Sequence, residues 1–136
     1  MATRTLMITS AAFLALIGLA TSFMPQEVLA LHGTVPDNAT LLMVQMMGAI
    51  YLGFAFLNWM ARGVLIGGIY ARPIAIGNFL HFGMVAIMLT KAAIVYDATP
   101  LAMSAFVYAV FAVGFGVVLF TTPGAVKVNS TPASDD

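Results

Sequence analysis

The chain has 136 residues and no net charge; 62% of its residues are hydrophobic and only 7% are charged. Soluble domains carry roughly 25% charged residues, so these few charges cannot solvate the surface of a water-soluble globule. The sequence has no basic tract, which excludes a nucleic-acid partner, and no cysteine, which excludes disulfides and thiolate sites. The composition instead predicts an integral, multi-pass membrane protein.

Four apolar segments each approach the length of about 20 residues that a helix needs to cross a bilayer. They cover about residues 6–24, 41–61, 73–95 and 101–122. The first segment follows Arg4 and shares features with a secretory signal peptide, but its length favours a retained helix. The sequence therefore predicts an all-α fold, a four-helix transmembrane bundle formed by residues 1–125.

The loop after the first span predicts a short helix lying in the membrane interface. Pro25 suits a first helical position, Glu27 lies among apolar residues, and Gly33 suits the end of the helix. Asp37 or Asn38 can then cap the second span. After the last span, the polar residues 126–136 have the composition of a disordered tail.

The basic residues predict the orientation of the bundle. If the four spans alternate in direction, Arg4, Arg62, Arg72 and Lys127 share one side of the membrane, and only Lys91 lies toward the other. Cytoplasmic loops carry the excess of basic residues in membrane proteins. Both termini are therefore expected in the cytoplasm.

Small residues form two stripes at helical spacing. The first span carries Ala11, Ala15, Gly18 and Ser22, and the fourth carries Ala105, Ala109, Ala112 and Gly116. Small side chains let helix backbones approach closely in lipid, where apolar faces alone drive no association. The stripes therefore predict packing seams, either within one chain or between copies of it.

Most polar side chains at membrane depth flank the link between the second and third spans. The candidate ligand-binding residues are Tyr51, Asn58, Arg62, Arg72, Asn78 and His81. Residues three or four apart share a helix face, and consecutive antiparallel spans are expected to pack together. This arrangement predicts one recess on the cytoplasmic side.

Two interpretations of this recess stay open. The amides and the imidazole can satisfy one another as ordinary interhelical contacts. Alternatively, they line a site for a lipid, a quinone or a small amphipath whose acidic group binds the arginines. The pattern assigns no catalytic residue and no metal site.

His81 also raises the question of a haem or chlorophyll-type cofactor, because Gly77 one turn earlier leaves room for a flat macrocycle. The other histidine, His32, is expected at the opposite surface, which disfavours a tetrapyrrole held by two histidines. Proton transfer is a further role for a histidine. No intramembrane carboxylate accompanies His81 in the sequence, so a proton relay would lack a second group that accepts or donates the proton.

Arg4, the loop from Met24 to Leu31 and the segment from Gly48 to Arg62 (GAIYLGFAFLNWMAR) resemble small bacterial four-helix membrane families such as the DoxX-like group. The resemblance implies an association with redox or quinone-linked membrane proteins and carries over no catalytic residue.

The short loops and the small-residue seams favour a non-catalytic accessory or assembly subunit of a larger membrane complex. Its expected partners are membrane lipids and other membrane-protein chains, or further copies of itself. Two alternatives stay open: a bundle that binds or transports a lipid, a quinone or a small amphipath, and a membrane enzyme or pigment-binding subunit that uses His81.

Overall fold

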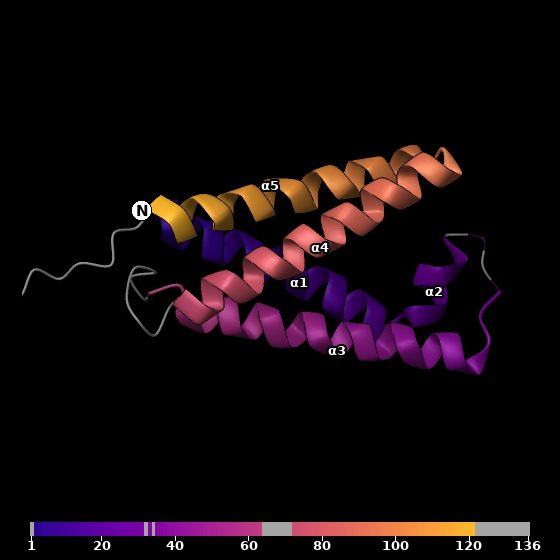
Figure 1. The fold of residues 1–136 in the computed structure, drawn as a ribbon. Helices are drawn as coiled ribbons and strands as arrows, with labels where there is room; N and C mark the ends of the chain where they lie inside the picture. Colours follow the sequence, from indigo (N-terminus) through magenta and orange to yellow (C-terminus); the bar gives the residue numbers. More distant parts are fainter. Residues whose placement is uncertain (1, 32, 34, 64–71, 122–136) are drawn as a thin grey trace, which may run out of the picture.

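The computed structural model describes residues 2–31, 33, 35–63 and 72–121 (Figure 1). Its helices are α1 (Ala2–Phe23), α2 (Pro25–Ala30), α3 (Asn38–Ala61), α4 (Arg72–Tyr96) and α5 (Thr99–Thr121). All except α2 are long and apolar enough to cross a membrane. The predicted all-α bundle of four spans, with a short helix in the first loop, is therefore confirmed. The expected tail, residues 126–136, lies outside the described residues.

The first loop has the start and stop signals that the sequence predicts. Pro25 begins α2, and Gly33 follows that helix with a φ of 69°, a left-handed conformation that glycine adopts without strain. Asp37 caps α3, because its carboxylate accepts a hydrogen bond of 2.8 Å from the backbone N–H of Thr40. Hydrogen bonds from the side chain and the backbone of Thr40 hold the pKa of the Asp37 carboxyl below its usual value.

The turn between α4 and α5 ends α4 with a left-handed residue. Asp97 has a φ of 47°, and the backbone N–H of Ala98 donates to the carbonyl oxygen of Ala93 at 3.2 Å. This hydrogen bond reaches back five residues and satisfies a carbonyl that the end of the helix would otherwise leave free. The chain can therefore reverse direction within a few residues.

The long helices form two antiparallel pairs, α1 with α3 and α4 with α5 (Figure 1). In the first pair, a Cβ added to Gly18 would lie 2.9 Å from the backbone nitrogen of Leu52, and one added to Gly48 would lie 2.7 Å from that of Ser22. In the second pair, a Cβ on Gly116 would lie 3.1 Å from the ring of Phe79. Both predicted seams therefore act within the chain.

The expectation that the second and third spans pack closely is only partly right. The backbones of α3 and α4 approach each other at few positions, and the two helices diverge toward the end of the molecule that carries α2 (Figure 1). Each of them already lies against another helix along a small-residue seam. Side chains therefore make the connection between the pairs.

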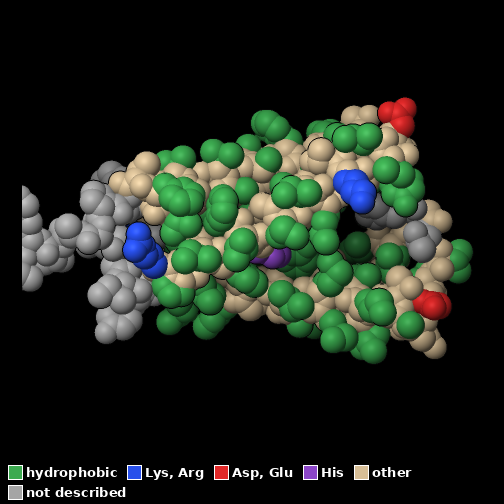
Figure 2. Space-filling view, in the orientation of Figure 1, with side chains coloured by type: hydrophobic (Ala, Val, Ile, Leu, Met, Phe, Trp, Pro, Cys, Tyr) green, Lys and Arg blue, Asp and Glu red, His purple; other side chains and the backbone are tan. Residues whose placement is uncertain are grey.

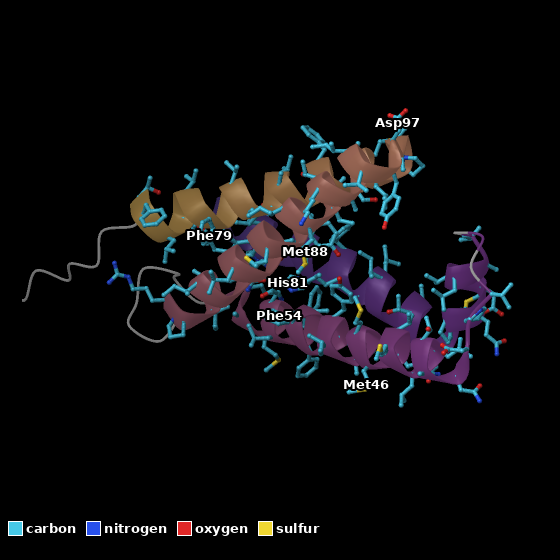
Figure 3. All side chains as sticks on the ribbon, turned by 45° about the vertical axis from the view of Figure 1, so that its right-hand side comes forward. Met46, Phe54, Phe79, His81, Met88 and Asp97 are labelled. Carbon is cyan, nitrogen blue, oxygen red and sulfur yellow. The ribbon has the colours of Figure 1, made fainter. Side chains whose placement is uncertain are left out.

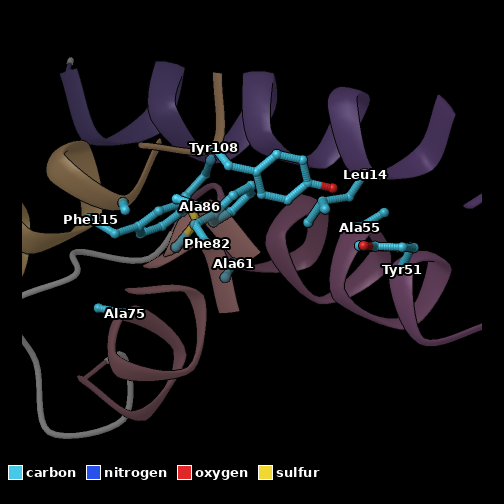
Figure 4. Close-up of a cluster of buried hydrophobic side chains, with 11 residues drawn as sticks. Leu14, Tyr51, Ala55, Ala61, Ala75, Phe82, Ala86, Tyr108 and Phe115 are labelled. Atoms are coloured by element: carbon cyan, nitrogen blue, oxygen red, sulfur yellow. The ribbon is translucent and has the colours of Figure 1, made fainter. Parts of the chain in front are cut away.

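Aromatic rings fill the junction between the two pairs (Figure 4). Within the second pair, Phe82 of α4 is completely buried and stacks on Phe111 and Phe115 of α5, with ring centroids 4.9 and 5.7 Å apart. Phe13 of α1 meets the ring of Tyr108 edge-on at 5.2 Å and lies 6.4 Å from Phe82. Aromatic pairs in such geometries stabilise by about 0.5–1.5 kcal/mol beyond the area they bury.

The helix directions bring Arg4, Arg62 and Arg72 to one end of the bundle (Figure 1). Lys91 lies in the half of α4 nearer the other end, and Lys127 lies outside the described residues. The grouping of the three arginines agrees with alternating spans. The cytoplasmic location of this end stays a prediction.

Candidate functional site

Asn58 of α3 and Asn78 of α4 form a reciprocal amide pair in the core. Each side-chain nitrogen donates to the side-chain oxygen of the other residue at 2.7 Å, and both residues are completely buried. The Asn58 nitrogen also donates to the hydroxyl of buried Ser10 at 3.1 Å, and that hydroxyl donates to the Met7 carbonyl oxygen. We call Ser10, Asn58 and Asn78 the amide clamp, because they join α1, α3 and α4.

The amide clamp uses every donor that its amides possess. The second hydrogen of the Asn78 amide goes to the carbonyl oxygen of Ile74 at 2.9 Å, and that of Asn58 goes to Ser10. A side-chain amide has two N–H donors and one carbonyl oxygen, and here each of these groups is engaged. Inside a bilayer no water can substitute for a missing partner. The geometry therefore fits the interpretation in which the amides satisfy one another.

His81 lies one turn from Asn78 on the same helix, in very different surroundings. Its ring stacks on Phe54 of α3 with centroids 4.9 Å apart and meets Tyr51 edge-on at 5.4 Å (Figure 3). Its Nε2 atom is buried and has no hydrogen-bond partner among the described residues. The imidazole is therefore a polar group at membrane depth that the bundle itself leaves unsatisfied.

Two phenol groups complete the surroundings of His81. Tyr51 of α3 and Tyr108 of α5 are both buried. The Tyr108 ring lies 6.3 Å from the imidazole and the Phe82 ring lies 5.3 Å from it. We call Tyr51, Phe54, His81, Phe82 and Tyr108 the His81 cluster. Figure 2 shows the surface hollowed between the helix pairs, toward the end that carries α2.

The two arginines are not part of either group. The guanidinium of Arg62 lies over the ring of Trp59, 4.1 Å from its centroid, and donates to the Trp59 carbonyl oxygen at 2.5 Å. Arg62 follows the last residue of α3, so its long side chain can fold back onto the preceding turn. Arg72 is exposed at the first residue of α4. Arginine on tryptophan is a favourable cation–π contact.

The single predicted recess thus resolves into separate parts. The structure joins Asn58 to Asn78 and Tyr51 to His81, and it turns Arg62 toward Trp59. Ligand binding by these residues stays a prediction.

Sequence reasoning missed Ser10, Phe13 and Tyr108 as neighbours of the candidate residues. Ser10 carries a hydroxyl within an apolar span, and Tyr108 is a phenol near the middle of another, so both residues offered a signal. Phe13 offered none, because phenylalanine is common on every face of this chain.

The surroundings of His81 do not fit a flat macrocycle. Phe54 stacks on one face of the imidazole, and its ring lies 3.8 Å from a Cβ added to Gly77. The space beside Gly77 that a tetrapyrrole would need therefore borders a phenylalanine ring.

Comparison of the chain with family models, with curated proteins and with solved structures gave no match. The resemblance to the DoxX-like group stays a prediction. Function must be argued from the site rather than from the fold, because one fold serves many functions.

Proposed function

We propose that this integral membrane protein is a non-catalytic subunit of a larger membrane complex, with an accessory or assembly role. The closed amide clamp carries the proposal. Its amides use their hydrogen-bonding groups within the bundle, so turning one of them toward a substrate would leave a buried partner unsatisfied. That loss costs about 1–3 kcal/mol for each group. These buried polar contacts between helices therefore support the assembly of the bundle.

The outer faces of the two pairs support the same proposal. Aromatic side chains such as Phe56 of α3 and Phe106 of α5 are 67% and 70% exposed. In a membrane these rings can pack against lipid or against the apolar helices of another chain. A rigid body joined by internal polar contacts can present such faces without changing shape.

Native mass spectrometry of the gently solubilised protein tests this proposal. We expect the chain to be recovered with at least one other membrane protein at fixed stoichiometry. An isotopically labelled copy, added after solubilisation, controls for association in the detergent and should not acquire the partner. Recovery of the chain without any partner, in mild detergent and in native lipid particles alike, would overturn the proposal.

The unsatisfied Nε2 atom of His81 supports a second candidate function, the binding of a neutral amphipath such as a quinone. A carbonyl or hydroxyl head group would supply the hydrogen bond that the imidazole lacks, since a ring nitrogen donates or accepts according to its tautomer. The aromatic side chains of Tyr51 and Phe54 would contact a ring-shaped head group.

Mass spectrometry of the small molecules retained by the purified protein tests the second candidate. The variant His81→Phe keeps an aromatic ring and removes the ring nitrogens, so it should lose one neutral species that the wild type retains. Identical profiles for wild type and variant would exclude this function while leaving the subunit role untouched.

A further inference from the structure

An apolar groove runs along the outer surface of the α1–α3 pair. Its volume is about 380 Å³, and Ala11, Ala12, Ala15, Leu52, Ala55, Phe56 and Trp59 line it. The lining combines alanines of both helices with the larger side chains Leu52, Phe56 and Trp59 of α3. This shape suits a flexible hydrocarbon chain, which can follow a narrow channel between two helices.

The groove reaches the end of the bundle that carries the arginines. Trp59 lies in the last turn of α3, where tryptophan commonly marks the boundary between hydrocarbon and head groups. The guanidinium of Arg62 lies directly over this same tryptophan ring, at 4.1 Å. Its hydrogen bond to the Trp59 carbonyl oxygen uses one of five N–H donors. The planar guanidinium has four further N–H donors, a geometry that suits a phosphate.

A second groove on the molecule provides an internal comparison. It lies between α4 and α5, has a volume of about 510 Å³, and includes Thr90, Asp97 and Ala105 in its lining. Asp97 lies at the end of α4, so this groove carries a carboxylate where the first one meets a guanidinium. Charge complementarity therefore distinguishes the grooves, and only the α1–α3 groove suits an anionic head group.

We infer that the α1–α3 groove holds an acyl chain of an anionic phospholipid whose phosphate binds Arg62. This site goes beyond the proposed subunit role and is separate from the His81 cluster, since it uses Leu52, Phe56 and Trp59 of α3. Basic residues beside helix contacts recognise lipid phosphates in this way. Both parts of the lipid contribute to binding. The acyl chain contacts the apolar lining of the groove, and the phosphate binds the guanidinium of Arg62, which lies over Trp59.

Native mass spectrometry of the purified full chain, supplied with defined lipids, tests the inference. The probes are phosphatidylglycerol, phosphatidylcholine with matched chains, and glycerol 3-phosphate, which has the phosphate without the chains. We expect one phosphatidylglycerol to be retained in preference to phosphatidylcholine, and no retention of glycerol 3-phosphate. Retention of glycerol 3-phosphate would show a free phosphate site and overturn the lipid assignment.

Matched variants locate the site. Arg62→Gln should lower phosphatidylglycerol retention about five-fold, as expected from roughly 1 kcal/mol for each basic residue at a membrane surface. Arg72→Gln removes an arginine that begins α4 at the same end of the bundle, whereas Arg62 is the arginine that lies over Trp59, so this variant should leave retention unchanged. Ala12→Leu fills the groove from an exposed position and should lower retention of both lipids.

Three results would overturn the inference. Equal losses from Arg62→Gln and Arg72→Gln would show only general attraction between positive charge and anionic lipid. Unchanged retention in folded Ala12→Leu, or in Phe56→Ala as a second groove variant, would show that the chain binds elsewhere. Loss of a partner protein rather than of lipid from Ala12→Leu would identify the groove as a contact for another helix.

Discussion

Two kinds of interface hold this bundle together, and they solve the problem of packing in lipid differently. Within the pairs, Gly18 and Gly48 let the backbones of α1 and α3 come almost into contact. Between the pairs, α3 and α4 stay farther apart and meet through the Asn58–Asn78 amides and the rings of Phe54 and His81, while Phe13 of α1 lies against Phe82 of α4. The α1–α3 pair combines close backbone approach with one buried hydrogen bond, from Asn58 to Ser10, whereas the wider α3–α4 junction relies on side-chain contacts.

This difference makes the interfaces sensitive to opposite changes. Added atoms disrupt a seam, because a larger side chain pushes the two backbones apart and breaks their contact. The junction is destroyed by removing hydrogen-bonding groups, because each amide is the partner of the other. Substitutions that separate these two responses test whether the interfaces are distinct.

The largest effect should come from Gly48→Ala, which adds one methyl group to the α1–α3 seam. Its Cβ would lie 2.7 Å from the backbone nitrogen of Ser22, which cannot move aside as a flexible side chain can. Overpacking of this kind costs about 3 kcal/mol, measured as the free energy of unfolding in a denaturing-detergent titration. Gly53→Ala is the matched control on the same helix, since a Cβ there meets nothing within 4 Å. Equal stability of the two variants would show that close backbone approach at Gly48 does not stabilise the α1–α3 pair.

The next largest effect should come from Asn58→Leu in the amide clamp. Leucine has a similar size, but it leaves the buried carbonyl oxygen of Asn78 without its donor. We expect a loss of about 2 kcal/mol in the free energy of unfolding. The double variant Asn58→Leu/Asn78→Leu removes both partners and should recover to within about 1 kcal/mol of the wild type. A double variant that shows the sum of the two single losses would contradict the reciprocal pairing.

A smaller effect of the opposite sign is expected at His81. The variant His81→Phe keeps the stacking on Phe54 and removes the buried Nε2 atom that lacks a partner. Removing an unsatisfied polar group should raise the free energy of unfolding by about 1 kcal/mol in ligand-free protein. The same detergent titration measures it, with Asn58→Leu as the contrasting variant. A loss of stability in His81→Phe would mean that the imidazole contributes a contact that phenylalanine cannot replace.

The smallest effect is expected at Asp37, which belongs to neither interface. Its folded-state pKa is lowered by Thr40, so the cap contributes its full stability above the ordinary carboxyl pKa and loses it as the pH falls through the folded value. The carboxylate is fully exposed, so solvent weakens the effect. Asp37→Asn keeps a capping oxygen and should lose this part of the pH dependence in thermal unfolding. Identical pH profiles for wild type and Asp37→Asn would contradict a role for the charge.

The local parts of the fold were predictable because local signals determine them. Hydropathy indicates the four spans, and Pro25, Gly33 and Asp37 mark helix ends through their own backbone and side-chain chemistry. The pairing of the spans was not predictable. The small-residue stripes on the first and fourth spans indicate which helix faces pack closely against another helix. Their spacing does not determine that these partner helices are α3 and α4.

The candidate site was predictable to a similar extent. Asn58 and Asn78 lie at equal depth on consecutive spans, so their pairing was one of the two interpretations that the pattern allowed. The position of Arg62 over Trp59 depends on side-chain torsion angles, which helical spacing does not determine. The missing partner of His81 depends on four rings from three helices, and no sequence window contains them all.

The two pairs also follow one another along the chain, since α3 ends at Ala61 and α4 begins at Arg72. Synthesis therefore completes the first pair, with its entire seam, before the second pair enters the membrane. We expect insertion to proceed as the meeting of two finished units, in which only side-chain contacts remain to be formed. A gene divided between these helices would encode two polypeptides that each keep their own backbone seam. The Asn58–Asn78 amides, the aromatic junction and the packing of Leu6 beside Gly114 would then be contacts by which the halves recognise one another.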